Sequence, residues 1–194
     1  MKKIFVLLLV MFLLTACGKA DEGKEVSPDK SSTNETTVES ATVETVEPTI
    51  TFEDGTVETE DFSLAISETK IIQSPMEANP GLFVTFTLTN KTKDKDIIPD
   101  DTLMSLLAQQ ENGTSRIDLS ENYHFLDAFG SEDDIETYNK MVDLDNAGSN
   151  ALLPGKSVEY VAAYGLDNDT HDVTFTAIDQ ITFEQVGKYN VKLK

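Results

Sequence analysis

Few side chains in this sequence are of the types that carry out chemistry. The chain of 194 residues contains one cysteine, Cys17, and two histidines, His124 and His171. One cysteine cannot form a disulfide within the chain, and three such residues leave little for a zinc site or a thiol active site. No nucleotide-binding loop and no serine nucleophile elbow occur, so no cofactor is predicted. The remaining candidate chemistry is that of the carboxylates.

Calcium is the metal to consider for so acidic a chain, because it prefers oxygen ligands. One acidic segment begins like an EF-hand loop, but Ala147 stands at a ligand position and Pro154 replaces the bidentate Glu. A second segment has Asp172 where that loop requires Gly. The alternative is that these acids are solvated turn residues and helix caps. The weak calcium candidates are Asp143, Asp145, Asp167 and Asp169, with a third cluster at Glu132, Asp133, Asp134 and Glu136.

The N-terminal segment has the pattern of a secretory signal. Lys2 and Lys3 precede an uninterrupted apolar run from Ile4 to Leu14. A transmembrane helix needs about 20 apolar residues, so this run is too short to span a bilayer. It has the length of the hydrophobic region of a signal peptide. The next residues, Leu14-Thr15-Ala16-Cys17, resemble the lipobox of bacterial lipoprotein precursors.

That resemblance implies a lipid anchor on Cys17. In such precursors the signal is cleaved between the residues corresponding to Ala16 and Cys17, and the cysteine thiol carries a diacylglycerol. Residues 1–16 are thus predicted to be a signal peptide, and the mature chain is predicted to be anchored at the outer face of the cell membrane. Two acyl chains hold a protein where one is marginal. An ordinary signal peptide with an incidental cysteine is the alternative.

Residues 17–60 are predicted to be a disordered tether that begins at the lipidated cysteine. This stretch is rich in Asp, Glu, Ser and Thr, and Phe52 is its only aromatic residue. Such a composition buries too little apolar area to offset the entropy of an ordered chain. The segment Thr49-Ile50-Thr51-Phe52 is an exception that could add an edge strand.

Residues 61–194 are predicted to be one all-β domain. Apolar and small polar residues alternate from Phe62 to Ile66 and from Leu82 to Thr89, which is typical of half-buried strands. At least six short strands separated by turns indicate a two-layer antiparallel sandwich. The other expected strands lie at 103–110 (with a helix as the alternative), 115–119, 158–164, 173–177 and 189–193.

The segment Ser120–Asn150 differs from its surroundings. Ser131 and the acids after it fit a helix-capping pattern, and Ile135, Tyr138 and Val142 recur at helical spacing. We therefore predict a short helix near residues 132–142.

The combined pattern resembles the immunoglobulin-like, telokin-like extracellular lipoprotein domains of Gram-positive bacteria, a family of unknown function. The resemblance rests on the lipobox, the acidic linker, VTFTLTN at Val84–Asn90, and LLPGKSVEYVAAYGL at Leu152–Leu166. It covers roughly residues 62–194 and implies an immunoglobulin-like sandwich. It supplies no catalytic residues.

The leading functional hypothesis is a non-enzymatic, surface-tethered binding module with an envelope or extracellular protein as its partner. The net charge of −20 opposes nucleic acid as a partner. The variable loops would be Ser74–Pro80, Ile97–Thr102 and the Ser120–Asn150 segment. The alternative is a lipoprotein that captures a solute or cation for a transporter. A third, less favoured hypothesis is an envelope hydrolase built from His124, Asp127 and Tyr123.

Overall fold

The alternating segment after Pro80 forms the central strand of one sheet. Strand β4 (Gly81–Asn90) pairs with β3 (Phe62–Ile72) on one side and β7 (Ser157–Gly165) on the other. Every second residue of β4 faces the inner core, and the threonines between them face outward, as the period-two pattern predicts. These inner residues are at most 1% exposed: Leu82, Val84, Phe86 and Leu88.

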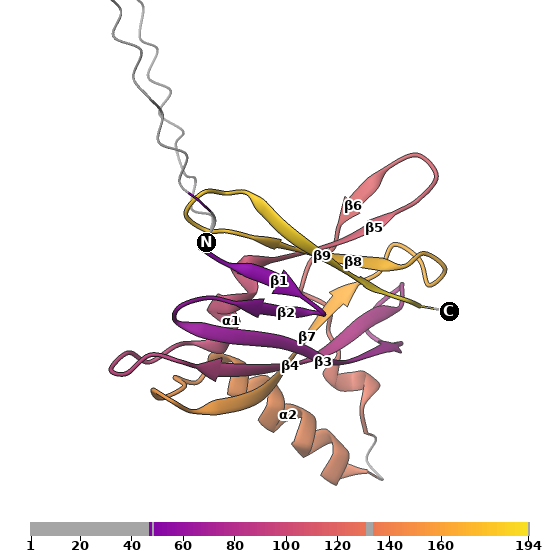
Figure 1. The fold of residues 1–194 in the computed structure, drawn as a ribbon. Coiled ribbons are helices and arrows are strands. Elements are labelled where there is room, and N and C mark those ends of the chain that lie inside the picture. Colours follow the sequence, from indigo (N-terminus) through magenta and orange to yellow (C-terminus); the bar gives the residue numbers. More distant parts are fainter. Residues whose placement is uncertain (1–46, 48, 131–133, 194) are drawn as a thin grey trace, which may run out of the picture. The chain divides into compact units, whose positions relative to one another are not determined.

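The structure is a computed structural model that describes residues 47, 49–130 and 134–193. Two antiparallel sheets pack face to face around the core (Figure 1). One sheet has the strand order β1-β2-β3-β4-β7 and the other β6-β5-β8-β9. The elements not yet given are β1 (Thr51–Glu53), β2 (Thr56–Glu58), α1 (Pro99–Thr102), η1 (Leu103–Ser105), β5 (Leu106–Glu111), β6 (Arg116–Asp118), η2 (Leu126–Ala128), α2 (Ile135–Ser149), β8 (Val173–Ile178) and β9 (Gln185–Val191).

The strand order is that of an immunoglobulin-like sandwich. Strands β3, β4 and β7 correspond to A, B and E of that fold, and β6, β5, β8 and β9 correspond to C′, C, F and G. The predicted all-β sandwich is confirmed. Of the two possibilities for residues 103–110, the strand is correct for most of the segment, because β5 follows the single turn η1.

The first hairpin corrects the predicted domain boundary. Strands β1 and β2 pair with each other, and β2 continues the sheet onto β3, with Val57 opposite Leu64. Ile50, Phe52 and Val57 are 8%, 6% and 0% exposed and belong to the main core. The predicted start of the folded part at residue 61 is therefore wrong. Charge density obscured a hairpin whose few apolar residues all face inward.

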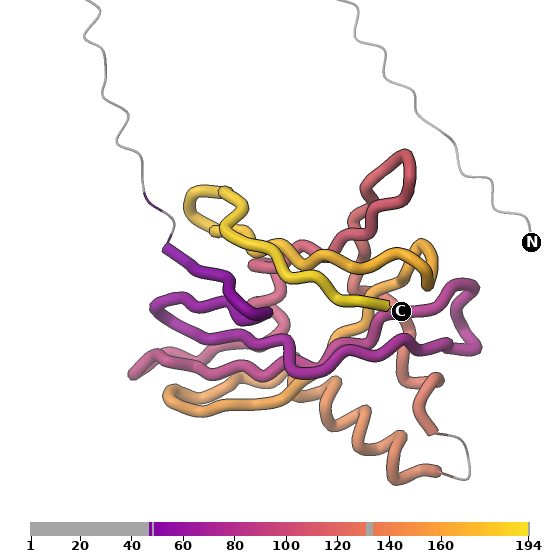
Figure 2. The backbone as a smooth tube through the Cα atoms, turned by 45° about the vertical axis from the view of Figure 1, so that its right-hand side comes forward, coloured from indigo at the N-terminus to yellow at the C-terminus, as the bar shows by residue number. Residues whose placement is uncertain are grey.

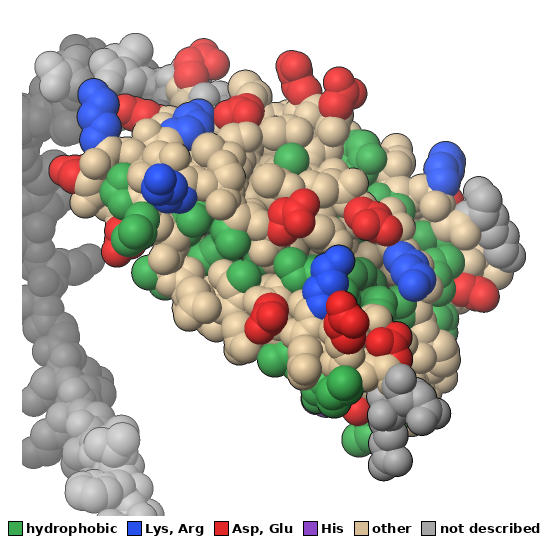
Figure 3. Space-filling view, turned by 90° about the horizontal axis from the view of Figure 1, so that it is seen from below, with side chains coloured by type: hydrophobic (Ala, Val, Ile, Leu, Met, Phe, Trp, Pro, Cys, Tyr) green, Lys and Arg blue, Asp and Glu red, His purple; other side chains and the backbone are tan. Residues whose placement is uncertain are grey.

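A second, smaller core lies on the outer face of the first sheet. There Phe83 and Val161 of the sheet pack with Phe125 and Met141 of the connection between β6 and β7. Phe83 contacts Phe125 edge-on, with ring centroids 5.3 Å apart. The connection thus covers part of a face that would otherwise be open to solvent. Figure 3 shows this side of the molecule, on which acidic and basic side chains are interspersed.

Helix α2 is longer than the sequence predicted. The carboxylate of Asp134 caps it by accepting a hydrogen bond from the backbone N–H of Thr137. The helix continues past the predicted end at 142 to Ser149. Near its end, Gly148 allows close packing against α1 because it has no side chain. A Cβ on Gly148 would lie 2.2 Å from Oδ1 of Asp100. In the part of the chain that is described, no helix is both long and apolar enough to cross a membrane.

The two ends of the sandwich have different connections. The described chain begins at the end that carries the β2–β3 turn, α1, η1 and the β8–β9 loop, and we call this the proximal end. The β3–β4 loop, the β5–β6 turn and the β7–β8 turn lie at the opposite, distal end (Figure 2). Strand β3 runs between the two ends over 11 residues, or about 35 Å at the usual rise per residue.

Candidate binding site

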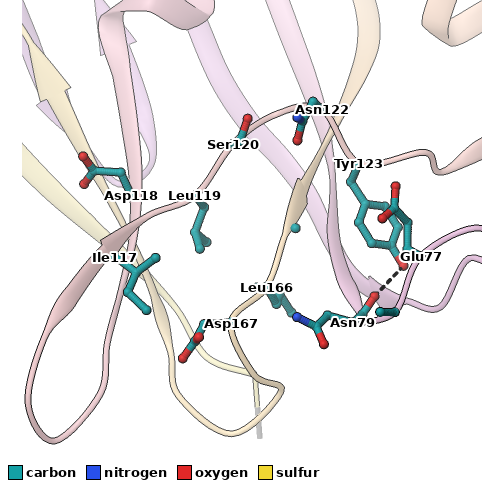
Figure 4. Close-up of a pocket in the computed structure, with 12 residues that line it drawn as sticks. Glu77, Asn79, Ile117, Asp118, Leu119, Ser120, Asn122, Tyr123, Leu166 and Asp167 are labelled. Atoms are coloured by element: carbon teal, nitrogen blue, oxygen red, sulfur yellow. Dashed lines mark hydrogen bonds between the residues drawn. The ribbon is translucent and has the colours of Figure 1, made fainter.

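A polar pocket opens at the distal end of the sandwich. Its volume is about 360 Å³, and three separate segments line it: the β3–β4 loop, the stretch from β6 to Tyr123, and the start of the β7–β8 turn (Figure 4). Two of these segments belong to the loops predicted to be variable, and the third was not predicted. The lining residues are Glu77, Ala78, Asn79, Ile117, Asp118, Leu119, Ser120, Asn122, Tyr123, Gly165, Leu166 and Asp167.

Tyr123 holds the pocket wall together. Its hydroxyl accepts a hydrogen bond from the backbone N–H of Ser74 at 2.9 Å and donates one to the carbonyl of Asn79 at 3.1 Å. Its ring lies over the first residue of β4, where a Cβ on Gly81 would come within 2.6 Å of the ring. Gly81 is therefore the residue that allows Tyr123 to reach the β3–β4 loop.

Gln110 fixes the opposite wall. It is 1% exposed, and its side-chain amide donates to the carbonyls of Asn168 and His171 at 2.9 and 2.7 Å. Its carbonyl oxygen accepts from the backbone N–H of Asp167 at 2.8 Å. The β7–β8 turn is thus attached to β5 by a buried side chain whose donors and acceptor are satisfied.

The pocket is negatively charged. Glu77, Asp118 and Asp167 line it, and none of its described lining residues is Lys or Arg. Hydrogen bonds from the backbone N–H and then the ring of His124 hold the pKa of Glu77 below its usual value. Glu77 therefore stays ionised at neutral pH, and the pocket favours a ligand with positive charge or hydrogen-bond donors.

The predicted calcium candidates do not assemble into a site. Asp143 and Asp145 lie within α2, so the segment that begins like an EF-hand loop is helical. In the turn that contains Asp167 and Asp169, Oδ1 of Asn168 accepts from the backbone N–H of Thr170. Among the residues that the structure describes, no three His, Cys, Asp or Glu side chains are grouped to hold a metal ion.

The third acidic cluster is described only in part. Asp134 caps α2, Glu136 lies in its first turn, and Glu132 and Asp133 are outside the described residues.

The residues of the hydrolase hypothesis are not arranged for catalysis. Tyr123 is buried and has the structural role described above. His124 pairs with Glu77 at 2.8 Å, and its side chain is 76% exposed. Asp127 lies in η2 and makes no side-chain hydrogen bond to His124. Within the described part of the chain, no serine or threonine hydroxyl is hydrogen-bonded to His124, as nucleophilic catalysis by a Ser–His pair would require.

Sequence reasoning found two of the three segments of the pocket and named two of its lining residues for other roles, Tyr123 for a hydrolase and Asp167 for calcium. Asn79, Ser120 and Asn122 are ordinary loop residues, and no sequence pattern distinguishes them from other turn-forming side chains. The signal that was available is Tyr123, an aromatic residue within a polar segment. The predicted Ile97–Thr102 loop lies at the proximal end and is not part of the pocket.

Replacing Tyr123 by Phe is expected to loosen the pocket wall while the core stays intact. Ser74 is fully buried, so loss of the hydroxyl leaves its N–H without a partner, at a cost of about 1–3 kcal/mol. Hydrogen exchange should accelerate in residues 74–80, and urea unfolding measures the loss of stability. Tyr189→Phe is the matched control, because its hydroxyl makes no hydrogen bond within the described residues. Equal exchange in both variants would contradict the role of Tyr123.

Comparisons with known proteins agree on the fold. The sequence pattern of a family described as "Domain of unknown function (DUF5067)" matches residues 34–179. The structure is similar to that of a putative lipoprotein from Staphylococcus aureus subsp. aureus NCTC 8325, with a TM-score of 0.62 and 18% identity over 76% of this chain and 94% of that one.

A second similar structure is the NMR structure of a protein from Enterococcus faecalis. It gives a TM-score of 0.54 and 17% identity over 75% of this chain and 94% of that one. At such identities the likeness shows the fold alone. No curated protein matches the chain.

Proposed function

The chain belongs to the family described as a domain of unknown function, DUF5067, and from that premise we propose that it is a lipid-anchored envelope protein with a non-catalytic binding domain. Two observations support the anchor. Leu14–Cys17 resembles a lipobox, and a protein of the same fold from Staphylococcus aureus is itself described as a putative lipoprotein. Residues 1–16 are then the signal peptide, Cys17 carries the lipid, and the chain up to residue 46 links the anchor to the sandwich.

The observation that carries the binding role is the position of the polar pocket. The described chain begins at the proximal end, and the pocket opens at the distal end, about 35 Å away along β3. In a sandwich anchored through its N-terminus, the pocket would therefore be at the end away from the point of attachment. Loops on a rigid β scaffold are the usual place for recognition.

The charge of the pocket indicates the kind of partner. Glu77, Asp118 and Asp167 attract basic groups, and the whole chain carries a net charge of −20. We expect an envelope or extracellular protein that presents lysine or arginine side chains, and an association that weakens as salt screens the attraction.

A small solute is the second candidate ligand, because Asn79, Ser120 and Asn122 add neutral hydrogen-bonding groups to the same pocket. A solute that binds the folded state raises the melting temperature of the domain by mass action. If the natural ligand is instead a basic protein, small solutes should leave the melting temperature unchanged and cationic peptides should raise it. Thermal-shift measurements against solutes and cationic peptides therefore separate the two.

Protease treatment of intact cells tests the anchor and its orientation. A lysine-specific protease should cut after Lys19, Lys24 or Lys30 and release a fragment that contains the whole sandwich. A variant with these three lysines replaced by arginine should stay on the cells, which is the matched control. If the protease releases the fragment from broken cells only, the domain lies on the inner side of the membrane, and the proposal is contradicted.

A further inference from the structure

Three large apolar side chains are exposed at the proximal end of the sandwich. Met104, Ile181 and Phe183 are 70%, 66% and 76% exposed, and we call them the proximal apolar cluster. Isolated exposed apolar residues are common on protein surfaces. These three come from two loops that are fastened together, because the side-chain amide of Gln180 donates to the carbonyl of Met104 at 2.6 Å.

The loop that carries Ile181 and Phe183 is held in one conformation. Asp179 is fully buried, and its carboxylate accepts hydrogen bonds from the backbone N–H groups of Ile181 and Thr182 at 2.8 and 2.9 Å. The loop closes with a hydrogen bond from the N–H of Phe183 to the carbonyl of Asp179. Phe183 has φ 58°, a conformation that aromatic residues rarely adopt. The loop is therefore built to hold its apolar side chains outward.

The same carboxylate also binds the beginning of the described chain. Asp179 accepts from the backbone N–H and the hydroxyl of Thr49 at 2.6 and 2.9 Å. Figures 1 and 2 both show the β8–β9 loop beside the start of β1. The described chain thus begins next to the proximal apolar cluster, at the end opposite the pocket.

We propose that the proximal apolar cluster inserts into the interfacial region of the lipid bilayer, so that the anchored domain rests on the membrane with its pocket facing away. This inference rests on the proposed lipid anchor. The anchor keeps the cluster at high effective concentration near the bilayer, so a weak insertion suffices. Because the loop is already rigid, insertion costs little ordering.

The charges around the cluster are of both signs. Glu60, Asp61 and Glu184 lie in the same loops or next to them. Lys91 is at the same end, where it pairs with Glu58 and donates to the carbonyl of Thr59. Insertion of the apolar side chains therefore requires no charged lipid, and a zwitterionic surface is the simplest test.

The chain contains no tryptophan, which allows a direct test. Phe183→Trp places a fluorophore in the cluster, and Met76→Trp places one at a similarly exposed site of the distal end, where Met76 is 69% exposed. Residues 17–194 of each variant are coupled through the thiol of Cys17 to a maleimide lipid in phosphatidylcholine vesicles. The coupling supplies an anchor whether or not the cell lipidates the protein.

We expect the tryptophan emission of the Phe183→Trp variant to shift to the blue and to be quenched by lipids brominated in their acyl chains. The emission of the Met76→Trp variant should stay unquenched. Ile181→Trp is the second reporter if Phe183→Trp fails to give a cooperative unfolding transition.

Equal, low quenching at both sites would overturn the inference while leaving the proposed anchor untouched. A blue shift without vesicles, together with a dimer mass in solution, would also overturn it, because the cluster would then be covered by a second copy of the chain. Failure of the anchor itself is detected separately, by loss of the natural protein from cell membranes.

Discussion

Replacing Asn90 by Asp is expected to cost about 3–5 kcal/mol of folding free energy. Asn90 is fully buried at the end of β4. Its side-chain amide donates hydrogen bonds to the carbonyls of Lys95 and Leu152, both at 2.8 Å. Its carbonyl oxygen accepts from the backbone N–H and the hydroxyl of Thr92. One side chain thereby joins β4, the turn after it and the segment before β7.

The aspartate keeps the shape of the side chain but loses both donors. The carbonyls of Lys95 and Leu152 then lose the amide donor and face a carboxylate oxygen, although Leu152 keeps the hydrogen bond from the N–H of Ile97. The loss is a large share of the roughly 5–15 kcal/mol by which such domains are stable. Urea unfolding at pH 7 measures it as a lower midpoint.

The loss of folding free energy in the Asn90→Asp variant should depend on pH. Burial beside two carbonyl oxygens raises the pKa of the introduced carboxyl above its unfolded value. The charged form is therefore penalised above that raised pKa. As the pH falls through this raised pKa, the carboxyl becomes protonated and regains one hydrogen-bond donor. The difference in the free energy of unfolding between the variant and the wild type therefore shrinks.

Asn112→Asp is the matched control. The carbonyl oxygen of Asn112 also accepts backbone N–H groups, from Thr114 and Ser115, but its amide donates to no other described residue. An aspartate keeps every one of these bonds, so we expect a change within about 0.5 kcal/mol. If both variants lose the same stability, a buried amide at Asn90 is not what joins the segments.

Sequence periodicity predicted the strands whose two faces have different surroundings. In β4 the inner residues are apolar and the outer ones are mostly threonine, so the pattern was visible without the structure. The edge strand considered for Thr49–Phe52 is present as β1, but its partner β2 was missed because acidic and turn-forming residues surround Val57. The length of α2 was missed because Gly148, a poor helix former, is needed there for contact with Asp100.

Buried polar side chains were beyond sequence reasoning for another reason. Asn90, Gln110 and Asp179 are residue types common in surface turns, and nothing local marks them as buried. Each has at least one hydrogen-bond partner on a distant segment, 57 or more residues away for Gln110, 62 for one partner of Asn90 and 130 for one partner of Asp179. The pocket has the same origin, since it exists only where three distant segments meet.

Replacing Cys17 by Ser is expected to abolish the lipid label and to leave protein that is either released or uncleaved, with its apolar signal segment still attached. Each acyl methylene buried in a bilayer contributes about 0.8 kcal/mol, so two chains hold a protein firmly and their loss removes that binding. The serine hydroxyl replaces the thiol that would carry the diacylglycerol. Fractionation and labelling with a radioactive fatty acid measure both effects. Ser27→Ala, also in the predicted tether, is the control and should remain bound and labelled.

The variant also separates the two membrane contacts that we propose. Without the lipid, the proximal apolar cluster is left with three side chains and no elevated local concentration, which gives at most weak and reversible binding. Complete retention of Cys17→Ser without label, at the mass of the chain without residues 1–16, would show that the cluster, rather than the thiol, holds the protein on the membrane. Retention with label would show that the lipid is attached elsewhere, and the assignment of residues 1–16 as a lipoprotein signal would then be wrong.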